Sequence, residues 1–155
     1  MKKKCRKWLC LICWMVVIYL FSAQPHSGEV THGVLLKILP SFHGSVFVDW
    51  LNFLVRKSAH FWEYFILTYF IYSLLEEYFE GKKFIILFSL LFCFFYSLTD
   101  EVHQVFVPGR SGMFRDCIVD TCGGGFFILL HLLLCRKKKV VKYPLRHKIR
   151  QKIID

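Results

Sequence analysis

One stretch of the chain carries residues whose types and spacing suit chemistry. Arg56, His60 and Glu63 lie four and three positions apart, so an α-helix would present all three on one face. Histidine and carboxylate side chains transfer protons, and the planar guanidinium of arginine binds carboxylate or phosphate groups. This spacing predicts a site that holds an anion and moves a proton.

Two later groups have similar spacing. Asp100, His103 and Gln104 follow the i, i+3, i+4 pattern of one helical face, whereas Glu101 is rotated by about 100° from Asp100. Further along, two aspartates stand one helical turn apart at positions 116 and 120. We expect the three groups to meet in one pocket, because the helices that carry them are predicted to end on the same side of the fold.

Four apolar segments must position these groups. Each is apolar on all sides, and each reaches or approaches the length of about 20 residues that a membrane-spanning helix needs. The sequence therefore predicts an all-α polytopic membrane protein with four transmembrane helices and with outer loops that carry short helices. Buried helices of a soluble protein are the alternative for the set, and a cleaved signal peptide is the alternative for the first span. The predicted spans are residues 8–24, 58–76, 84–100 and 117–135.

The spans form a single predicted domain, residues 1–135, which is followed by a basic tail, residues 136–155. Between the first two spans, residues 30–39 are expected to form a short interfacial helix. Residues 46–56 are expected to run on into the second span or to bend just before it. The glycines at positions 123–125 are small residues of the kind that let membrane helices approach closely.

The distribution of positive charge predicts the orientation. The chain has 155 residues, 55% of them hydrophobic, and a formal net charge of +10, so it is too apolar to be disordered and too short for a two-domain soluble enzyme. Sixteen of its 21 Lys and Arg residues fall in the N-terminal segment, the loop between the second and third spans, or the tail. Positive residues concentrate on the cytoplasmic side, so both termini are expected in the cytoplasm. Nucleic-acid binding is not expected, because the basic tail is short and lacks an aromatic-interleaved module.

In this orientation all three polar groups lie in the outer half of the bundle. Ionisable residues inside a membrane protein mark a functional site by default. The alternative for Glu63 is a purely structural ion pair with Lys57 or Arg110. The candidate catalytic residues are His60, Glu63, Asp100, Glu101 and His103, and the candidate substrate-binding residues are Arg56, Lys57, Gln104, Arg110, Asp116 and Asp120.

Several stretches resemble the signatures of one known family. Residues 56–65 (RKSAHFWEYF) resemble the first signature of the VanZ-like family, residues 99–112 (TDEVHQVFVPGRSG) the second, and residues 115–124 (RDCIVDTCGG) the third. Residues 21–25 (FSAQP) resemble the polar end of the family's first helix. The resemblance extends over nearly the whole chain and implies a four-helix integral membrane protein of bacteria. It also implies an analogy with glycopeptide resistance, because the family is named for a protein linked to resistance to teicoplanin-type drugs.

The residues leave more than one function open. The first hypothesis is an enzyme or binding protein that acts on an anionic amphipathic envelope molecule, such as a lipid-linked cell-wall precursor. Arg56 and Arg110 would hold the anion, and Glu63 or His60 would move a proton. In a variant of this hypothesis, a divalent metal binds to His60 and Glu63, with further ligands from Asp100, Glu101 and His103.

A second hypothesis is a non-catalytic membrane scaffold or partner protein whose charged residues form a structural network. A transporter is a third, although four short helices without an internal repeat make a narrow bundle. The sequence leaves the oligomeric state open.

Overall fold

The described part of the chain consists of five α-helices and one short 3₁₀ turn, and it contains no β-strand. The computed structural model describes residues 2–42, 45–110 and 112–151, with side chains up to Cys135. The elements are α1 (Lys2–Ser22), α2 (Ser27–Ile38), η1 (Pro40–Phe42), α3 (Val46–Leu75), α4 (Lys82–Val105) and α5 (Phe114–Gln151).

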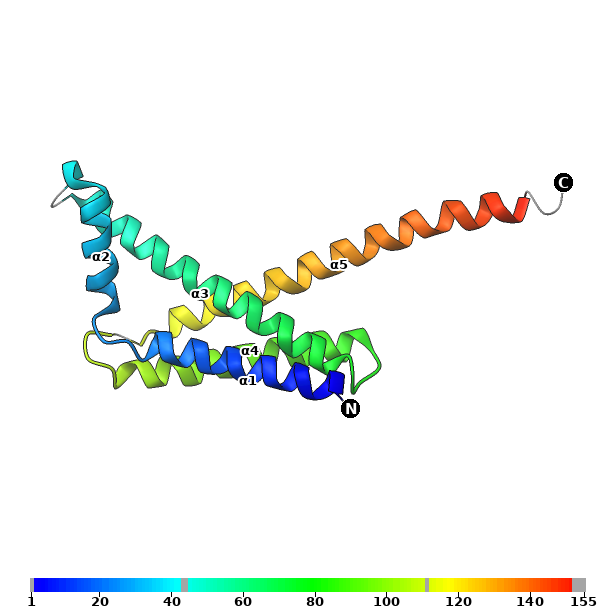
Figure 1. Ribbon diagram of the computed structural model, residues 1–155, viewed down its shortest axis with the longest axis horizontal. Helices are drawn as coiled ribbons and strands as arrows, with labels where there is room; N and C mark the ends of the chain where they lie inside the picture. Colours follow the sequence, from blue (N-terminus) through cyan, green and yellow to red (C-terminus); the bar gives the residue numbers. More distant parts are fainter. Residues whose placement is uncertain (1, 43–44, 111, 152–155) are drawn as a thin grey trace.

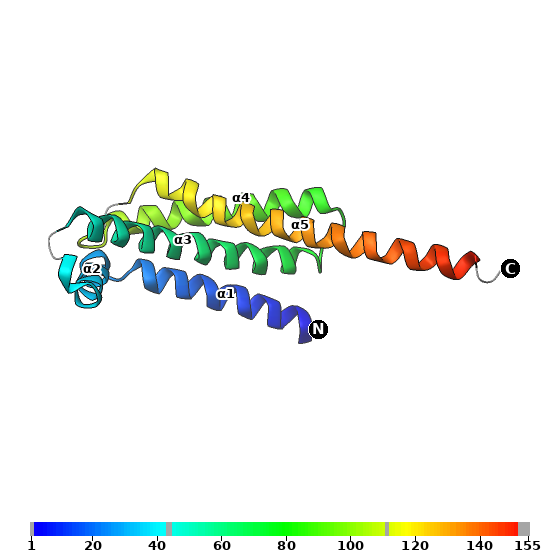
Figure 2. The same cartoon turned by 90° about the horizontal axis from the view of Figure 1, so that it is seen from above.

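Four of these helices, α1, α3, α4 and α5, form a bundle in which consecutive long helices run in opposite directions (Figure 1). The short helix α2 lies at one end of the bundle, with the end of α1, the start of α3, the end of α4 and the start of α5 (Figures 1 and 2). We call this the α2 end. The start of α1 and the hairpin between α3 and α4 lie at the opposite end, and α5 continues past it.

The bundle exposes large apolar side chains along its length, which is the pattern of a protein surrounded by lipid. Three helices are long and apolar enough to cross a membrane: α1, α4 and the Phe114–Cys135 part of α5. Only 17% of the apolar window of α1 is buried inside the protein, and 33% of the windows of α4 and α5. In water this much exposed apolar surface would be unfavourable, so these helices need lipid around them.

The predicted number of spans is therefore confirmed only in part. Helix α3 is long and packs among the other three, but polar residues such as His60, Glu63 and Tyr64 lower its hydropathy, and it is not one of the three. The fourth span stays a prediction.

Two other predictions about the region before the second span are confirmed. Helix α3 begins at Val46 and continues without interruption to Leu75, so residues 46–56 do run on into the helix that carries the predicted second span. Helix α2 supplies the short helix expected at residues 30–39, although it begins earlier, at Ser27. The predicted basic tail continues α5 as helix through Gln151, and its side chains lie outside the described residues.

The end opposite α2 is held by charged and aromatic contacts between α1 and the α3–α4 hairpin. Lys7 Nζ lies 2.6 Å from Glu77 Oε1 and also donates to the carbonyl of Ser73. Lys3 Nζ lies 3.2 Å from the same carboxylate. The two ammonium groups hold the pKa of the Glu77 carboxyl below its usual range. These contacts align the start of α1 with the end of α3, and so set which residues of α1 reach the α2 end.

Glycines in α5 allow close contact with α3 and α4, as the sequence predicts. A Cβ atom at Gly123 would collide with the carbonyl of Phe61 in α3, and one at Gly124 would lie 2.9 Å from Sγ of Cys93 in α4. A Cβ at Gly125 would meet nothing within 4 Å. Gly123 is therefore the point where α5 crosses the backbone of α3.

Replacement of these glycines by alanine tests this packing. We expect Gly123→Ala to destabilise the bundle by about 1–3 kcal/mol, because the new methyl group has no room against α3. Gly125→Ala should leave stability unchanged or raise it by up to about 1 kcal/mol, because alanine favours helix more than glycine. Thermal unfolding of the two variants in the same detergent measures the difference. Equal melting temperatures would contradict the close crossing at Gly123.

Candidate functional site

A pocket opens at the α2 end, among the end of α1, the start of α2, the middle of α3 and the loop after α4. Its volume is about 300 Å³, at the lower end of the range for small-molecule sites. Two arginines, a histidine and a glutamate contribute to a wall that otherwise contains mainly small polar side chains. The charged or titratable lining residues are Arg56, His60, Glu63 and Arg110, and the polar ones are Ser22, Gln24, Ser27 and Thr31.

Arg110 is positioned by the end of α1. Its Nη2 donates to the carbonyl of Phe21 at 2.6 Å, and its Nε donates to the carbonyl of Gln24 at 3.3 Å. The last carbonyls of a helix lack partners within the helix and carry partial negative charge, so a guanidinium suits this place. Arg110 thereby joins the loop after α4 to the C-terminus of α1.

The backbone of the same loop also contacts the segment between α1 and α2. The amide of His26 donates to the carbonyl of Pro108 at 3.3 Å. Gly109 has a φ of 73°, and a Cβ there would lie 2.7 Å from Nδ1 of His26. Glycine is thus required at position 109 both for its left-handed conformation and for the close approach of His26.

Arg56 enters the pocket from α3 and is fixed against α2. A Cβ at Gly28 would lie 2.9 Å from Nη1 of Arg56, so the guanidinium lies directly on the first turn of α2. Asn52, one turn earlier in α3, donates to the carbonyl of Gly28 at 3.1 Å. Helix α2 therefore acts as a support that holds Arg56 toward the pocket.

The two guanidiniums are close enough to affect one another. Burial lowers the pKa of Arg110, and the positive charge of Arg56 lowers it further. Arginine keeps its charge at neutral pH because its ordinary pKa lies far above neutrality. Two cations that repel each other at a pocket wall are stabilised by an anion between them, so the electrostatics of this wall favour an anionic ligand.

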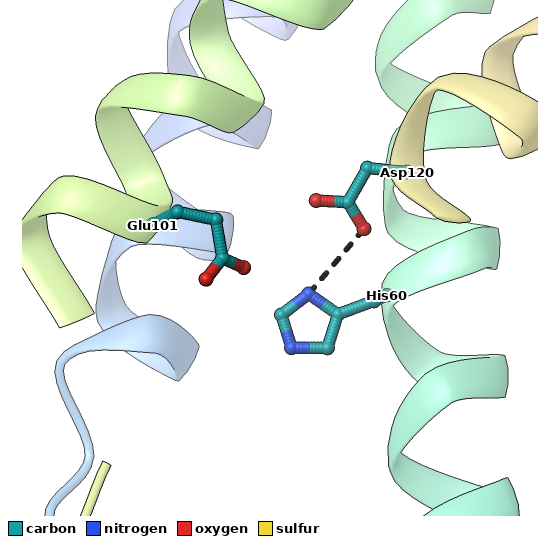
Figure 3. Close-up of side chains that lie close together, drawn as sticks. All are labelled: His60, Glu101 and Asp120. Atoms are coloured by element: carbon teal, nitrogen blue, oxygen red, sulfur yellow. Dashed lines mark ion pairs between the residues drawn. The ribbon is translucent and has the colours of Figure 1, made fainter. Parts of the chain in front are cut away.

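A second group of side chains surrounds the ring of His60 and comes from the neighbouring helices α4 and α5. Nδ1 of His60 lies 3.6 Å from Oδ1 of Asp120 in α5. One ligand-type atom from each of His60, Asp120 and Glu101 lies within 4.8 Å of the others. Figure 3 shows the three side chains pointing to a common centre from α3, α4 and α5. We call this group the buried triad.

The remaining predicted residues pair with one another nearby. Lys57 in α3 forms an ion pair with Asp116 in the first turn of α5. Within α4, Gln104 donates to Asp100 at 3.1 Å, and both side chains are buried. His103 packs its ring against Tyr19 of α1, with ring centroids 4.6 Å apart.

The structure thus brings some candidate residues together and separates others. Arg56, His60, Glu63 and Arg110 line the pocket, and a carboxylate oxygen from each of Glu101 and Asp120 lies within 4.8 Å of a ring nitrogen of His60. The structural ion pair considered for Glu63 is not formed with Lys57, which binds Asp116 instead. Among the described residues, Glu63 forms no ion pair, so its carboxylate is available to the pocket. A role for His103 stays a prediction, because its ring lies on α1 and outside the pocket lining.

Two contributions were not singled out from the sequence. Ser97 Oγ donates to Oδ2 of Asp120 at 2.5 Å. Ser97 lies one helical turn before Asp100 in α4, and this spacing could have indicated that Ser97 shares a face with the polar group. Thr31 reaches the pocket from α2, and nothing in its sequence surroundings indicates this, because it depends on how α2 folds back onto α3.

An all-helical, multi-pass membrane bundle with a charged pocket at one end is the class of protein that this fold and site define. The profile of the VanZ/LLP1 family matches residues 7–135, and the chain belongs to this family. The match contains every residue of the pocket and of the buried triad. No curated protein and no solved structure matches the chain.

The Lys57–Asp116 ion pair is expected to contribute to the free energy of unfolding whether or not a ligand is bound. Asp116→Asn should lower the unfolding free energy by about 1–3 kcal/mol, because it leaves a partly buried ammonium group without its counter-charge. Arg115→Gln, at the neighbouring exposed position, should change it by less than about 0.5 kcal/mol. Unfolding curves in detergent would measure both. A similar loss in the two variants would show that the ion pair does not join α3 to α5.

Proposed function

We propose that the protein crosses a bacterial cytoplasmic membrane four times, with α3 as the fourth span and the α2 end on the outer side. Helix α3 has the length of a span, and three of its polar residues, Arg56, His60 and Glu63, line the pocket. The basic residues of the N-terminal segment, the α3–α4 hairpin and the tail then lie on the cytoplasmic side, as the positive-inside rule requires.

The ligand proposed for the pocket is the anionic head group of an amphipathic envelope molecule. The observation that carries this proposal is the presence of two guanidiniums, Arg56 and Arg110, in the wall of one pocket at the α2 end. A volume of about 300 Å³ suits a phosphate with part of an attached sugar, while the acyl or prenyl chain of the ligand would lie in the bilayer. Planar guanidiniums form paired hydrogen bonds with phosphate oxygens, which makes them suited to this role.

His60 and Glu63 add the means to move a proton beside that anion. Both line the pocket, and a carboxylate next to a histidine is a common arrangement for acid–base chemistry. The proposal includes a lipid-linked cell-wall precursor as the bound molecule and a contribution of the protein to teicoplanin-type resistance. The support is family membership together with a pocket that suits a phosphorylated lipid.

The second candidate function is a non-catalytic membrane scaffold. The Lys57–Asp116 pair favours it, because that pair joins two helices and contacts no pocket. The pocket arginines argue for ligand binding instead, because no carboxylate among the described residues forms an ion pair with either of them.

A binding titration tests the proposal. The detergent-solubilised full chain would be titrated with a short-chain polyprenyl phosphate and, separately, with a zwitterionic phosphocholine of similar length. Trp14 reports binding by fluorescence, since its Nε1 donates to the backbone carbonyl of Glu63 beside the pocket. We expect the phosphate to bind and Arg56→Ala or Arg110→Ala to weaken it at least about tenfold, the loss expected for one charge-assisted hydrogen bond.

Arg115→Ala is the matched control for that titration, because it removes the same charge from an exposed position at the same end of the bundle. It should bind the phosphate as tightly as the unmodified protein. Arg110→Lys keeps the charge and distinguishes loss of charge from loss of loop structure. Equal weakening by Arg115→Ala, or equal affinity for the zwitterionic probe, would contradict a specific anion site.

A further inference from the structure

We propose that the buried triad, His60, Glu101 and Asp120, binds a divalent transition-metal ion just behind the pocket. The inference rests on the geometry and burial of these three side chains and does not depend on the proposed function. Each ligand comes from a different helix of the bundle, so the ion would join α3, α4 and α5 (Figure 3).

The spacing of the three side chains suits a shared ion. Metal–ligand bonds to nitrogen and oxygen are about 2.0–2.2 Å long, which places the ligand atoms around one ion roughly 3–4.4 Å from one another. Nδ1 of His60 lies 3.6 Å from Oδ1 of Asp120, which is within this range and too long for a hydrogen bond. The third ligand-type atom, from Glu101, lies within 4.8 Å of the other two.

The atoms that face the centre lack hydrogen-bond partners. Nδ1 of His60, Oε1 of Glu101 and Oδ1 of Asp120 are buried, and each has no partner among the described residues. Buried polar atoms are rarely left in this state, because each one loses its contact with water without replacement. Three such atoms around one point indicate a group that binds all of them.

The second oxygen of each carboxylate is already held in place. Oε2 of Glu101 accepts a hydrogen bond from the backbone amide of Met113 at 2.7 Å. Oδ2 of Asp120 accepts from Ser97 Oγ at 2.5 Å. Outer hydrogen bonds of this kind fix ligand carboxylates in orientation, so Glu101 and Asp120 are positioned to offer one oxygen each.

The charges around the triad also favour a cation. Asp120 is 0% exposed and Glu101 is 4% exposed. Among the described residues, neither forms an ion pair with a lysine or arginine: Lys57 binds Asp116, and Arg110 binds the carbonyls at the end of α1. One imidazolium could balance a single carboxylate, whereas a divalent ion balances both, and uncompensated buried charge is strongly unfavourable.

The donor set indicates the class of metal. One imidazole nitrogen with two carboxylate oxygens suits ions from Mn²⁺ to Zn²⁺ better than Ca²⁺ or Mg²⁺, which prefer oxygen alone. Three protein ligands leave at least one coordination position open, as in catalytic rather than structural zinc sites. Because His60 also lines the pocket, an anion held by Arg56 and Arg110 would lie close to that open position.

Metal analysis of the full chain tests the proposal. The protein would be purified in detergent without a histidine tag, treated with EDTA, incubated with Mn²⁺ or Zn²⁺, desalted, and measured by elemental analysis. We expect one equivalent of at least one of these metals and a rise in melting temperature when it is added, since binding to the folded state alone stabilises it. Asp120→Asn and Glu101→Gln should each weaken binding at least about tenfold, while their amides can still accept from Ser97 and Met113.

Two control variants separate metal binding from folding. Asp116→Asn, one turn before Asp120 in α5, and Asp100→Asn, next to Glu101 in α4, each remove a buried carboxylate outside the triad. Both should bind the metal as the unmodified protein does, even where their melting temperatures fall. Folded unmodified protein that retains neither metal would overturn the proposal and would instead indicate a proton shared by the two carboxylates. Equal binding by Asp120→Asn would overturn it as well.

These results are distinguishable from those of the lipid titration. Arg56→Ala should bind the metal normally and lose the polyprenyl phosphate. If the protein binds the metal but not the polyprenyl phosphate, the metal site at the triad is supported and the ligand proposed for the pocket is wrong. If it binds the phosphate but not the metal, only the metal proposal is rejected.

Discussion

The structure of the α2 end depends on the compensation of buried acids. Four buried carboxylates and the pocket-lining Glu63 gather there within a bundle that has an apolar surface, and the buried ones lose water when the helices pack. Asp116 is balanced by Lys57, and Asp100 accepts a hydrogen bond from Gln104. Glu63 faces a pocket that also contains two arginines. Among the described residues, one oxygen of Glu101 and one of Asp120 have no hydrogen-bond partner, and each carboxylate lies within 4.8 Å of a ring nitrogen of His60. How these two acids are compensated therefore decides what the site can do.

The polar end is built in two layers. The outer layer is the arginine-bearing pocket, whose walls come from α1, α2, α3 and the loop after α4. The inner layer is the triad, whose side chains come from α3, α4 and α5. His60 belongs to both, since it lines the pocket and lies 3.6 Å from Asp120. This placement would couple events in the pocket to the charge state of the inner carboxylates. It depends in turn on Gly123, which lets α5 lie directly against α3.

Helical periodicity predicted part of the site correctly. It placed Arg56, His60 and Glu63 on one face of α3, and all three line the pocket because they share that helix. Periodicity also placed Glu101 and Asp100 on different faces of α4. That the Glu101 side chain lies close to Asp120 depends on how α5 packs against α4, which the sequence does not show. The position of His103 against Tyr19 could not be predicted, because it depends on how far α1 slides along α4. Apolar composition predicted four spans, and three of these helices are long and apolar enough to cross a membrane. Helix α3 also carries the polar residues that line the pocket, so hydropathy alone does not identify it as a span.

Side chains from separate helices converge at one end of the membrane bundle, and both the pocket and the buried triad depend on this convergence. An experimental structure of the full chain in lipid nanodiscs, prepared with Mn²⁺ or Zn²⁺ and a polyprenyl phosphate, tests this most directly. We predict density for an ion among His60, Glu101 and Asp120, and density for a phosphate between Arg56 and Arg110. A structure in which these side chains point to different sides of the bundle, or lie at opposite membrane surfaces, would contradict the account.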